Sequence, residues 1–282
     1  MKESVLRFEC GIESLVGILA EPTGDAAELG VVIVVGGPQY RAGSHRQFTL
    51  LARHLAAHGH AVLRFDYRSM GDSTGEPRDF LGVDDDIAAA ITALLAARPT
   101  LKQVALWGLC DAASAILLYL NAHRDPRVAG IALLNPWVRS TASLARTHVK
   151  HYYWRRLRDK SFWLKLLRGG VGWTALRGLG GNLKLAGSER RHAGNGSFQD
   201  RMALGLKAFP GPALLILSGD DYVAKEFCLR EQESPAWAGL LQAERLTRHD
   251  LPEADHTFSD LQQSAKVETM TLNWLTQLRT LP

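Results

Sequence analysis

The chain has 282 residues, of which 46% are hydrophobic, 22% charged and 8% aromatic. These proportions are those of an ordinary globular protein of one or two domains, so a wholly disordered chain is excluded. No apolar run reaches the roughly 18 residues of a membrane span, and the first residues lack the apolar core of a secretory signal. Three cysteines are too few for a disulfide framework and lack the spacing of zinc ligands, so we expect a reducing, cytoplasmic environment.

Apolar strand-like runs alternate with amphipathic helical stretches along most of the chain. An edge hairpin is expected from residues 5–10 and 15–19. Further strands are predicted over residues 31–35, 61–65, 104–107, 131–134 and 213–217. Helices are predicted over residues 46–58, 83–98, 113–122 and about 259–278. The alternation predicts an α/β fold with a mostly parallel sheet and helices on both of its faces.

The strongest chemical signal is the turn between strand 104–107 and the helix that follows it. Small residues, Gly108 and Ala112, stand two positions before and after Cys110, as in the pattern G-x-S-x-G of a nucleophile elbow. Such a turn exposes the central side chain at the start of a helix, where the dipole and free amides favour a thiolate. The turn departs from this pattern in two ways: a cysteine replaces the serine, and an alanine replaces the last glycine. A buried structural cysteine is the alternative interpretation.

The partners of this nucleophile are predicted from the chain order nucleophile, acid, base. Asp220 and Asp221 follow strand 213–217, where the acid of such a triad stands. We prefer Asp221, because the residues after it fit the usual pattern better, and Asp220 remains the alternative. His256 lies in a predicted loop, 251–258, just before the last helix, and is the expected base.

An oxyanion hole needs two backbone donors, one after the nucleophile and one from the loop after an early strand. Asp111 supplies the first amide. Gly37 is the expected second donor, with Gln39 behind it, because Pro38 has no N–H.

Polar residues just past this loop are candidates for substrate binding. Gln39, Arg41, His45 and Arg46 stand there, and the three basic ones could meet an anionic group or simply be solvated. The chemistry requires no metal and no organic cofactor.

Five motifs in this order resemble the α/β-hydrolase superfamily over nearly the whole chain: residues 36–38, 66–73, the turn around Cys110, 219–221 and 255–258. The chain further resembles the exosortase A system-associated hydrolase type 1 family in residues 36–47, 108–115 and 224–227. That resemblance implies a bacterial cytoplasmic hydrolase linked to exopolysaccharide and protein-sorting loci. The Cys-Asp-His set is also similar to that of dienelactone hydrolases.

We interpret the protein as a hydrolase of an ester, thioester or related acyl bond that forms a covalent acyl-enzyme on Cys110. The expected partner is a small-molecule or acylated substrate. An acyltransferase on the same scaffold is one alternative. A non-catalytic binding protein with a hydrolase-like fold is another, although the complete set of nucleophile, acid and base counts against it.

Residues 137–209 interrupt the alternation and are predicted to be a helical insertion, which leaves 1–136 and 210–282 as the core. Residues 139–177 hold ten basic residues and one acidic residue, a net charge of +9 in a chain whose total is +4. A lid over the carboxyl edge of the sheet is expected, with a merely solvated helical insertion as the alternative.

Two stretches of this insertion, residues 152–158 and 162–168, interleave aromatic residues and leucines with cations. Such helices can lie in the interface of an anionic membrane, which would place the protein peripherally at the inner membrane. We favour the lid, because the insertion enters where lids usually enter this fold. Nucleic acid is not an expected partner, since no recognition motif accompanies the charge.

Overall fold

The computed structural model describes residues 1–24, 26–37, 39–139 and 196–278. The chain divides into two compact units, one formed by Met1–Trp137 with Phe198–Pro282 and the other by Val138–Ser197. The basic stretches 152–158 and 162–168 lie outside the described residues. The predicted lid and the predicted membrane contact concern these stretches, so both stay predictions.

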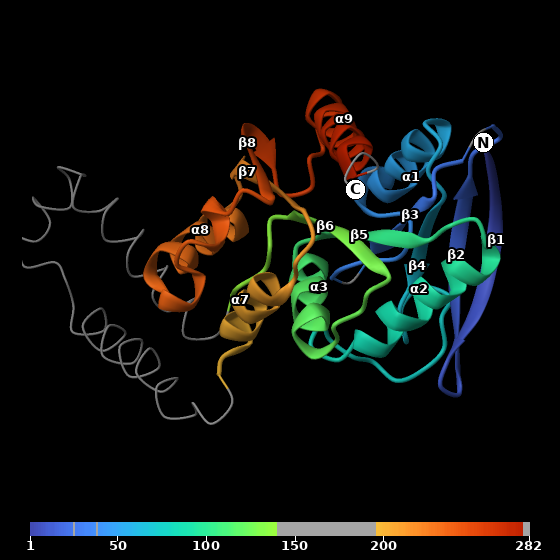
Figure 1. Cartoon of the computed structure of the whole chain (residues 1–282), viewed down its shortest axis with the longest axis horizontal. Coiled ribbons are helices and arrows are strands. Elements are labelled where there is room, and N and C mark those ends of the chain that lie inside the picture. Colours follow the sequence, from blue (N-terminus) through green and yellow to red (C-terminus); the bar gives the residue numbers. More distant parts are fainter. Residues whose placement is uncertain (25, 38, 140–195, 279–282) are drawn as a thin grey trace, which may run out of the picture. The chain divides into compact units, whose positions relative to one another are not determined.

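The first unit is built on an eight-stranded sheet with the order β1-β2-β4-β3-β5-β6-β7-β8 (Figure 1). The strands are β1 (Lys2–Cys10), β2 (Glu13–Glu21), β3 (Leu29–Val34), β4 (Val62–Asp66), β5 (Gln103–Leu109), β6 (Val128–Leu134), β7 (Ala213–Asp220) and β8 (Leu246–Asp255). β1 and β2 form the predicted antiparallel hairpin, and β2 also runs antiparallel to β4. All other neighbours are parallel.

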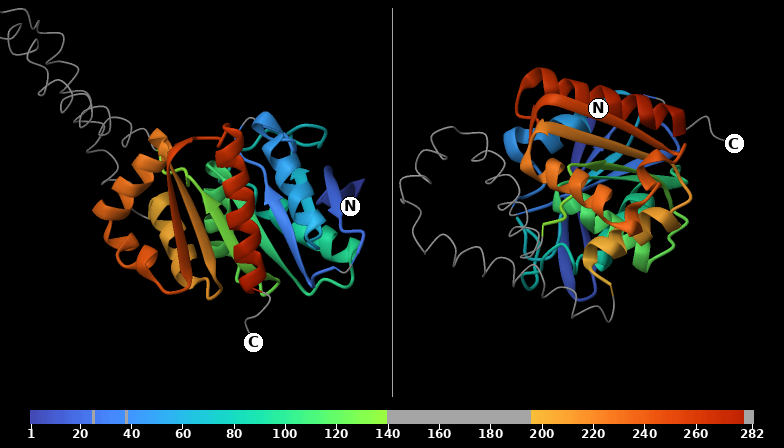
Figure 2. Two further views of the ribbon diagram at one scale, coloured as in Figure 1. Left: turned by 90° about the horizontal axis from the view of Figure 1, so that it is seen from above. Right: turned by 90° about the vertical axis from the view of Figure 1, so that its left-hand side faces the viewer.

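Helices cover both faces of this sheet, as predicted. They are α1 (Gln47–Ala57), α2 (Asp84–Ala97), α3 (Asp111–Ala122), α7 (Phe198–Ala208), α8 (Tyr222–Glu233) and α9 (Leu261–Leu278). α1 and α9 contact each other on one face, while α2, α3 and α7 pack together on the other (Figures 1 and 2). No helix among the described residues is long and apolar enough to cross a membrane.

The central strands are buried on both sides, which explains their continuous apolar sequences. Every residue of β3 is buried, because helices cover both faces of a parallel sheet and leave no side for water. Trp107 of β5 packs edge-on against Phe48 of α1, with ring centroids 5.7 Å apart. Burial of such apolar side chains contributes about 1.5–3 kcal/mol each.

Three elements differ from the predictions. Residues 251–255, expected in a loop, form the end of β8 at the edge of the sheet. α8 was expected only as a helix without bounds between Asp221 and His256. α7 was expected within the insertion, but it packs against α3, so closely that a side chain on Gly205 would meet the carbonyl oxygen of Leu117.

The strand order also determines where a site forms. From β3 the chain first moves to β4 on one side and then returns to β5 on the other side of β3. The loops after β3 and β5 therefore lie side by side at the carboxyl edge, where α/β sheets bind their ligands.

Candidate active site

Cys110 lies in the strained turn between β5 and α3. Its φ of 62° and ψ of −124° belong to a conformation that non-glycine residues rarely adopt. The turn is tight, because a side chain on Gly108 would come within 2.9 Å of three atoms of α3, and one on Gly36 would meet Ala112. The geometry of a nucleophile elbow is thus present, and the alanine at position 112 fits it.

His256 and Asp221 form a hydrogen-bonded pair in the same unit. His256 Nδ1 lies 2.8 Å from Asp221 Oδ2. The Asp221 side chain also caps α8 by accepting hydrogen bonds from the amides of Val223 and Ala224, at 3.0 and 3.2 Å. Asp220, the alternative acid, is the exposed last residue of β7.

The electrostatics of Asp221 favour a permanent carboxylate. Burial opposes its ionisation, but the hydrogen bonds from His256 and from the two helix amides outweigh burial and hold the pKa below its usual value. A carboxylate at Nδ1 leaves Nε2 of His256 to exchange a proton with a nucleophile.

A hydrogen-bond network that the sequence analysis missed joins the histidine loop to the ends of β6 and β7. The buried Asn135 donates from Nδ2 to Ser218 Oγ at 2.8 Å and to the carbonyl of His256 at 3.1 Å. Its Oδ1 accepts the amide of Ser218, at 2.8 Å. The residue before it, Leu134, accepts the Cys110 amide at 2.8 Å. Cys110 and His256 are therefore bound to consecutive residues at the end of β6.

Replacing Asn135 by alanine is expected to lower both stability and turnover. The variant removes a hydrogen-bond partner from the Ser218 amide, the Ser218 hydroxyl and the His256 carbonyl. It also places alanine at a φ of 43°, which asparagine tolerates better. We expect a loss of about 2–4 kcal/mol of unfolding free energy, measured by urea denaturation. Asn121→Ala, the same change at an exposed site, serves as the control. An Asn135→Ala variant with unchanged stability would show that this network does not hold the histidine loop.

The two predicted oxyanion donors lie next to each other. The Gly37 amide, at a φ of 63°, donates a hydrogen bond to the Asp111 carboxylate, with N to Oδ2 at 2.8 Å. The contact brings the loop after β3 against the first residue of α3. It connects residues 74 positions apart in the sequence.

The four candidate substrate-binding residues follow this loop, and two of them are engaged within the protein. Gln39 Oε1 accepts the Ser44 amide at 3.0 Å. The guanidinium of Arg41 pairs with the carboxylates of Asp66 and Asp72, which gives it a structural partner rather than a free face.

His45 and Arg46 belong to a short 3₁₀ turn, Ser44–Arg46, and both have a positive φ, of 52° and 62°. Substrate binding by any of the four residues stays a prediction.

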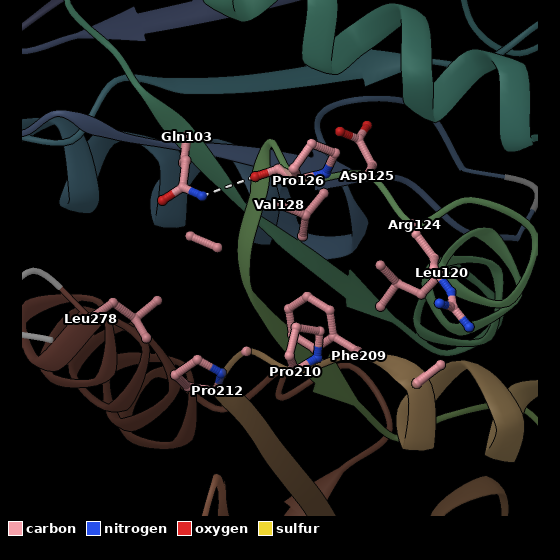
Figure 3. A pocket seen from close by; sticks show the side chains of 13 residues that line it. Gln103, Leu120, Arg124, Asp125, Pro126, Val128, Phe209, Pro210, Pro212 and Leu278 are labelled. Atoms are coloured by element: carbon pink, nitrogen blue, oxygen red, sulfur yellow. Dashed lines mark hydrogen bonds between the residues drawn. The ribbon is translucent and has the colours of Figure 1, made fainter. Parts of the chain in front are cut away.

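A pocket of about 620 Å³ lies away from these groups, near the amino ends of β5, β6 and β7 (Figure 3). Its lining includes Gln103, Val128, Phe209, Pro212 and Leu278. None of the candidate catalytic residues lines it, so its size says nothing about their substrate. In the described part of the chain, no group of three or more histidine, cysteine or acidic side chains is arranged to hold a metal ion.

The family is shown by comparison with known proteins. Residues 31–268 match the model of the alpha/beta hydrolase family, and the chain belongs to that family. A curated relative, the quorum-quenching protein AidA of Acinetobacter baumannii, is 31% identical over 118 residues. The match spans 40% of this chain and 37% of that protein.

Solved structures share the fold over the whole chain. The esterase Pf2001 of Pyrococcus furiosus superposes with a TM-score of 0.64 at 14% identity, covering 98% of this chain and 92% of that one. The α/β hydrolase GrgF of Penicillium sp. sh18 gives a TM-score of 0.64 at 18% identity, covering 100% of both chains. At these identities the similarity concerns the fold.

Proposed function

We propose that the protein hydrolyses a carboxylic ester or thioester through a covalent acyl-enzyme on Cys110. His256 is the general base and acid, and Asp221 orients it. The observation that carries this proposal is the pairing of His256 with Asp221 at 2.8 Å, in a loop tied to the strand end that holds the Cys110 amide.

The reaction then proceeds in two half-reactions. The Cys110 thiol gives its proton to Nε2 of His256, and the sulfur attacks the carbonyl carbon to form a tetrahedral oxyanion. Collapse of this intermediate breaks the bond to the leaving group, which takes the proton from His256. Water next attacks the thioester while His256 accepts its proton, and the carboxylic acid and the free thiol are released.

A chromogenic ester assay tests this function. The wild-type protein is expected to release p-nitrophenol from a short p-nitrophenyl ester, and the rate should follow the protein concentration. Hydrolysis that persists unchanged in a Cys110→Ala, His256→Ala double variant would contradict the proposal.

An acyltransferase remains the second candidate, because the same acyl-enzyme can pass its acyl group to an alcohol or amine. Adding an alcohol acceptor to the assay separates the two: a hydrolase releases mainly the acid, whereas a transferase releases mainly the new ester. We further propose a role linked to bacterial exopolysaccharide and protein-sorting loci, from the resemblance of residues 36–47, 108–115 and 224–227 to the exosortase A system-associated hydrolases; this resemblance names no substrate.

A further inference from the structure

The Asp111 side chain occupies the place where an oxyanion would bind. Its Oδ2 accepts the Gly37 amide at 2.8 Å, and its own amide and that of Ala112 also favour the charged form of the carboxyl. These donors include both amides that were predicted to form the oxyanion hole. The carboxylate oxygen thus stands in for the negatively charged oxygen of a tetrahedral intermediate.

Holding the ionised Asp111 carboxylate in this place is unfavourable in free energy. Its other oxygen, Oδ1, is buried and has no hydrogen-bond partner within the described part of the chain. Burial, the largest effect, raises the pKa of Asp111, although the three amides and the nearby His256 oppose that shift. A charged, half-buried group with one unsatisfied oxygen is easier to neutralise than a solvated one.

The groups that act on Asp111 come from three neighbouring elements. Tyr67 follows β4 and donates to the Gly37 carbonyl at 3.5 Å. Burial, together with the Asp111 charge, raises the pKa of Tyr67 to about 12, so Tyr67 is neutral at neutral pH. His256 follows β8, and Cys110 precedes Asp111 at the start of α3. His256, when protonated, adds a positive charge beside the carboxylate.

We propose that Asp111 is a charge-dependent gate of the oxyanion hole, which admits the acyl oxygen of a substrate when the carboxyl is protonated. This inference rests on the proposed function, since it concerns the same amides. An ionised Asp111 competes with the developing oxyanion for the Gly37 donor and repels its charge. A neutral carboxyl binds these amides more weakly and leaves them to the substrate.

The consequence is a dependence of turnover on the charge of Asp111. Activity towards an uncharged ester should fall as the pH rises through the titration of Asp111, in addition to the usual gain from deprotonation of the nucleophile and base. Asp111→Asn keeps the shape of the side chain and removes its charge, so the activity of this variant should not fall with pH in this way. Asp111→Ala removes the acceptor altogether and should change the profile in the same direction.

The experiment measures kcat/KM for p-nitrophenyl acetate from about pH 5 to about pH 9. We expect the ratio of Asp111→Asn to wild type to be constant while Asp111 is protonated and to rise with pH, by up to about tenfold per pH unit, once Asp111 ionises. Glu253→Gln, the same charge change at an exposed site of β8, should give a constant ratio. A constant ratio for both Asp111 variants would overturn the gate and leave the proposed function intact.

Thermal unfolding provides a measurement that does not need turnover. A carboxyl whose pKa is raised by folding stabilises the folded state below its unfolded pKa, and this contribution is lost as the pH rises through the folded pKa. The unfolding midpoint of wild type should therefore fall relative to Asp111→Asn over that range. Suppose that neither wild type nor any variant hydrolyses the ester, but the midpoint of wild type still falls with pH relative to that of Asp111→Asn. This result would support the titration of a half-buried Asp111 and contradict only the proposed function. A difference that does not change with pH overturns the gate.

Discussion

Replacing Cys110 by alanine is expected to reduce ester hydrolysis to the background rate, a loss of at least about a thousandfold in kcat. The variant removes the only sulfur that the strained turn presents at the start of α3, so no acyl-enzyme can form. A chromogenic ester assay at neutral pH measures the loss. Cys10→Ala and Cys228→Ala, the matched changes at the other cysteines, should retain activity.

The same difference should appear in thiol reactivity. Burial raises the pKa of Cys10 and also that of Cys228, so both are mostly thiols at neutral pH. Iodoacetamide is therefore expected to label Cys110 first, as followed by peptide mass spectrometry. Equal labelling of the three cysteines, together with full activity of Cys110→Ala, would contradict the proposal that Cys110 is the nucleophile.

Asp221→Asn is expected to cost on the order of 10⁴-fold in kcat while the fold stays intact. Asparagine keeps an acceptor for the first amides of α8 and is as good a helix cap as aspartate, so stability should change by less than about 1 kcal/mol. Its amide nitrogen, however, turns towards Nδ1 of His256 and places the ring proton on Nε2. That nitrogen can then no longer accept the thiol proton.

Asp220→Asn provides the control for this prediction, because Asp220 is exposed and His256 pairs with Asp221. It should retain most of the activity. The reverse ranking of the two variants would mean that the acid is one residue earlier. Thermal unfolding adds a second check. The lowered pKa of Asp221 means that its ionised form stabilises the fold above the unfolded pKa, and that this contribution is lost as the pH falls through the folded pKa.

Much of the fold could be predicted because buried strands and amphipathic helices have distinct periodicities. The β-branched run in β3 and the alanine-rich α2 left little ambiguity. β8 was expected only as a strand without bounds between Asp221 and His256, because it is an edge strand, with mostly polar, partly exposed residues and a proline at 252. α8 carries a weak apolar pattern, and its clearest signal is the capping Asp221, whose position after a strand also predicts the triad acid.

The candidate site, like the fold, could be predicted from the sequence only in part. Chain order and turn chemistry were sufficient to propose Cys110, Asp221 and His256, because the first two follow predicted strands and His256 precedes the last predicted helix. The network of Asn135 and Ser218 could not be predicted, since the two residues are 83 positions apart and meet only across neighbouring strands. The contact of Asp111 with Gly37 depends in the same way on the packing of α3 against the loop after β3.

The central claim is that an acyl group is carried on the Cys110 sulfur, and trapping it is the most direct test. Wild-type protein is mixed with a p-nitrophenyl ester and quenched in acid during the first turnovers, before deacylation empties the site. Mass spectrometry of the intact chain and of its peptides is expected to find one acyl group on the peptide that contains Cys110, and none in the Cys110→Ala variant. Steady turnover with no acyl group on that peptide, or with acyl groups spread equally over Cys10, Cys110 and Cys228, would contradict the account.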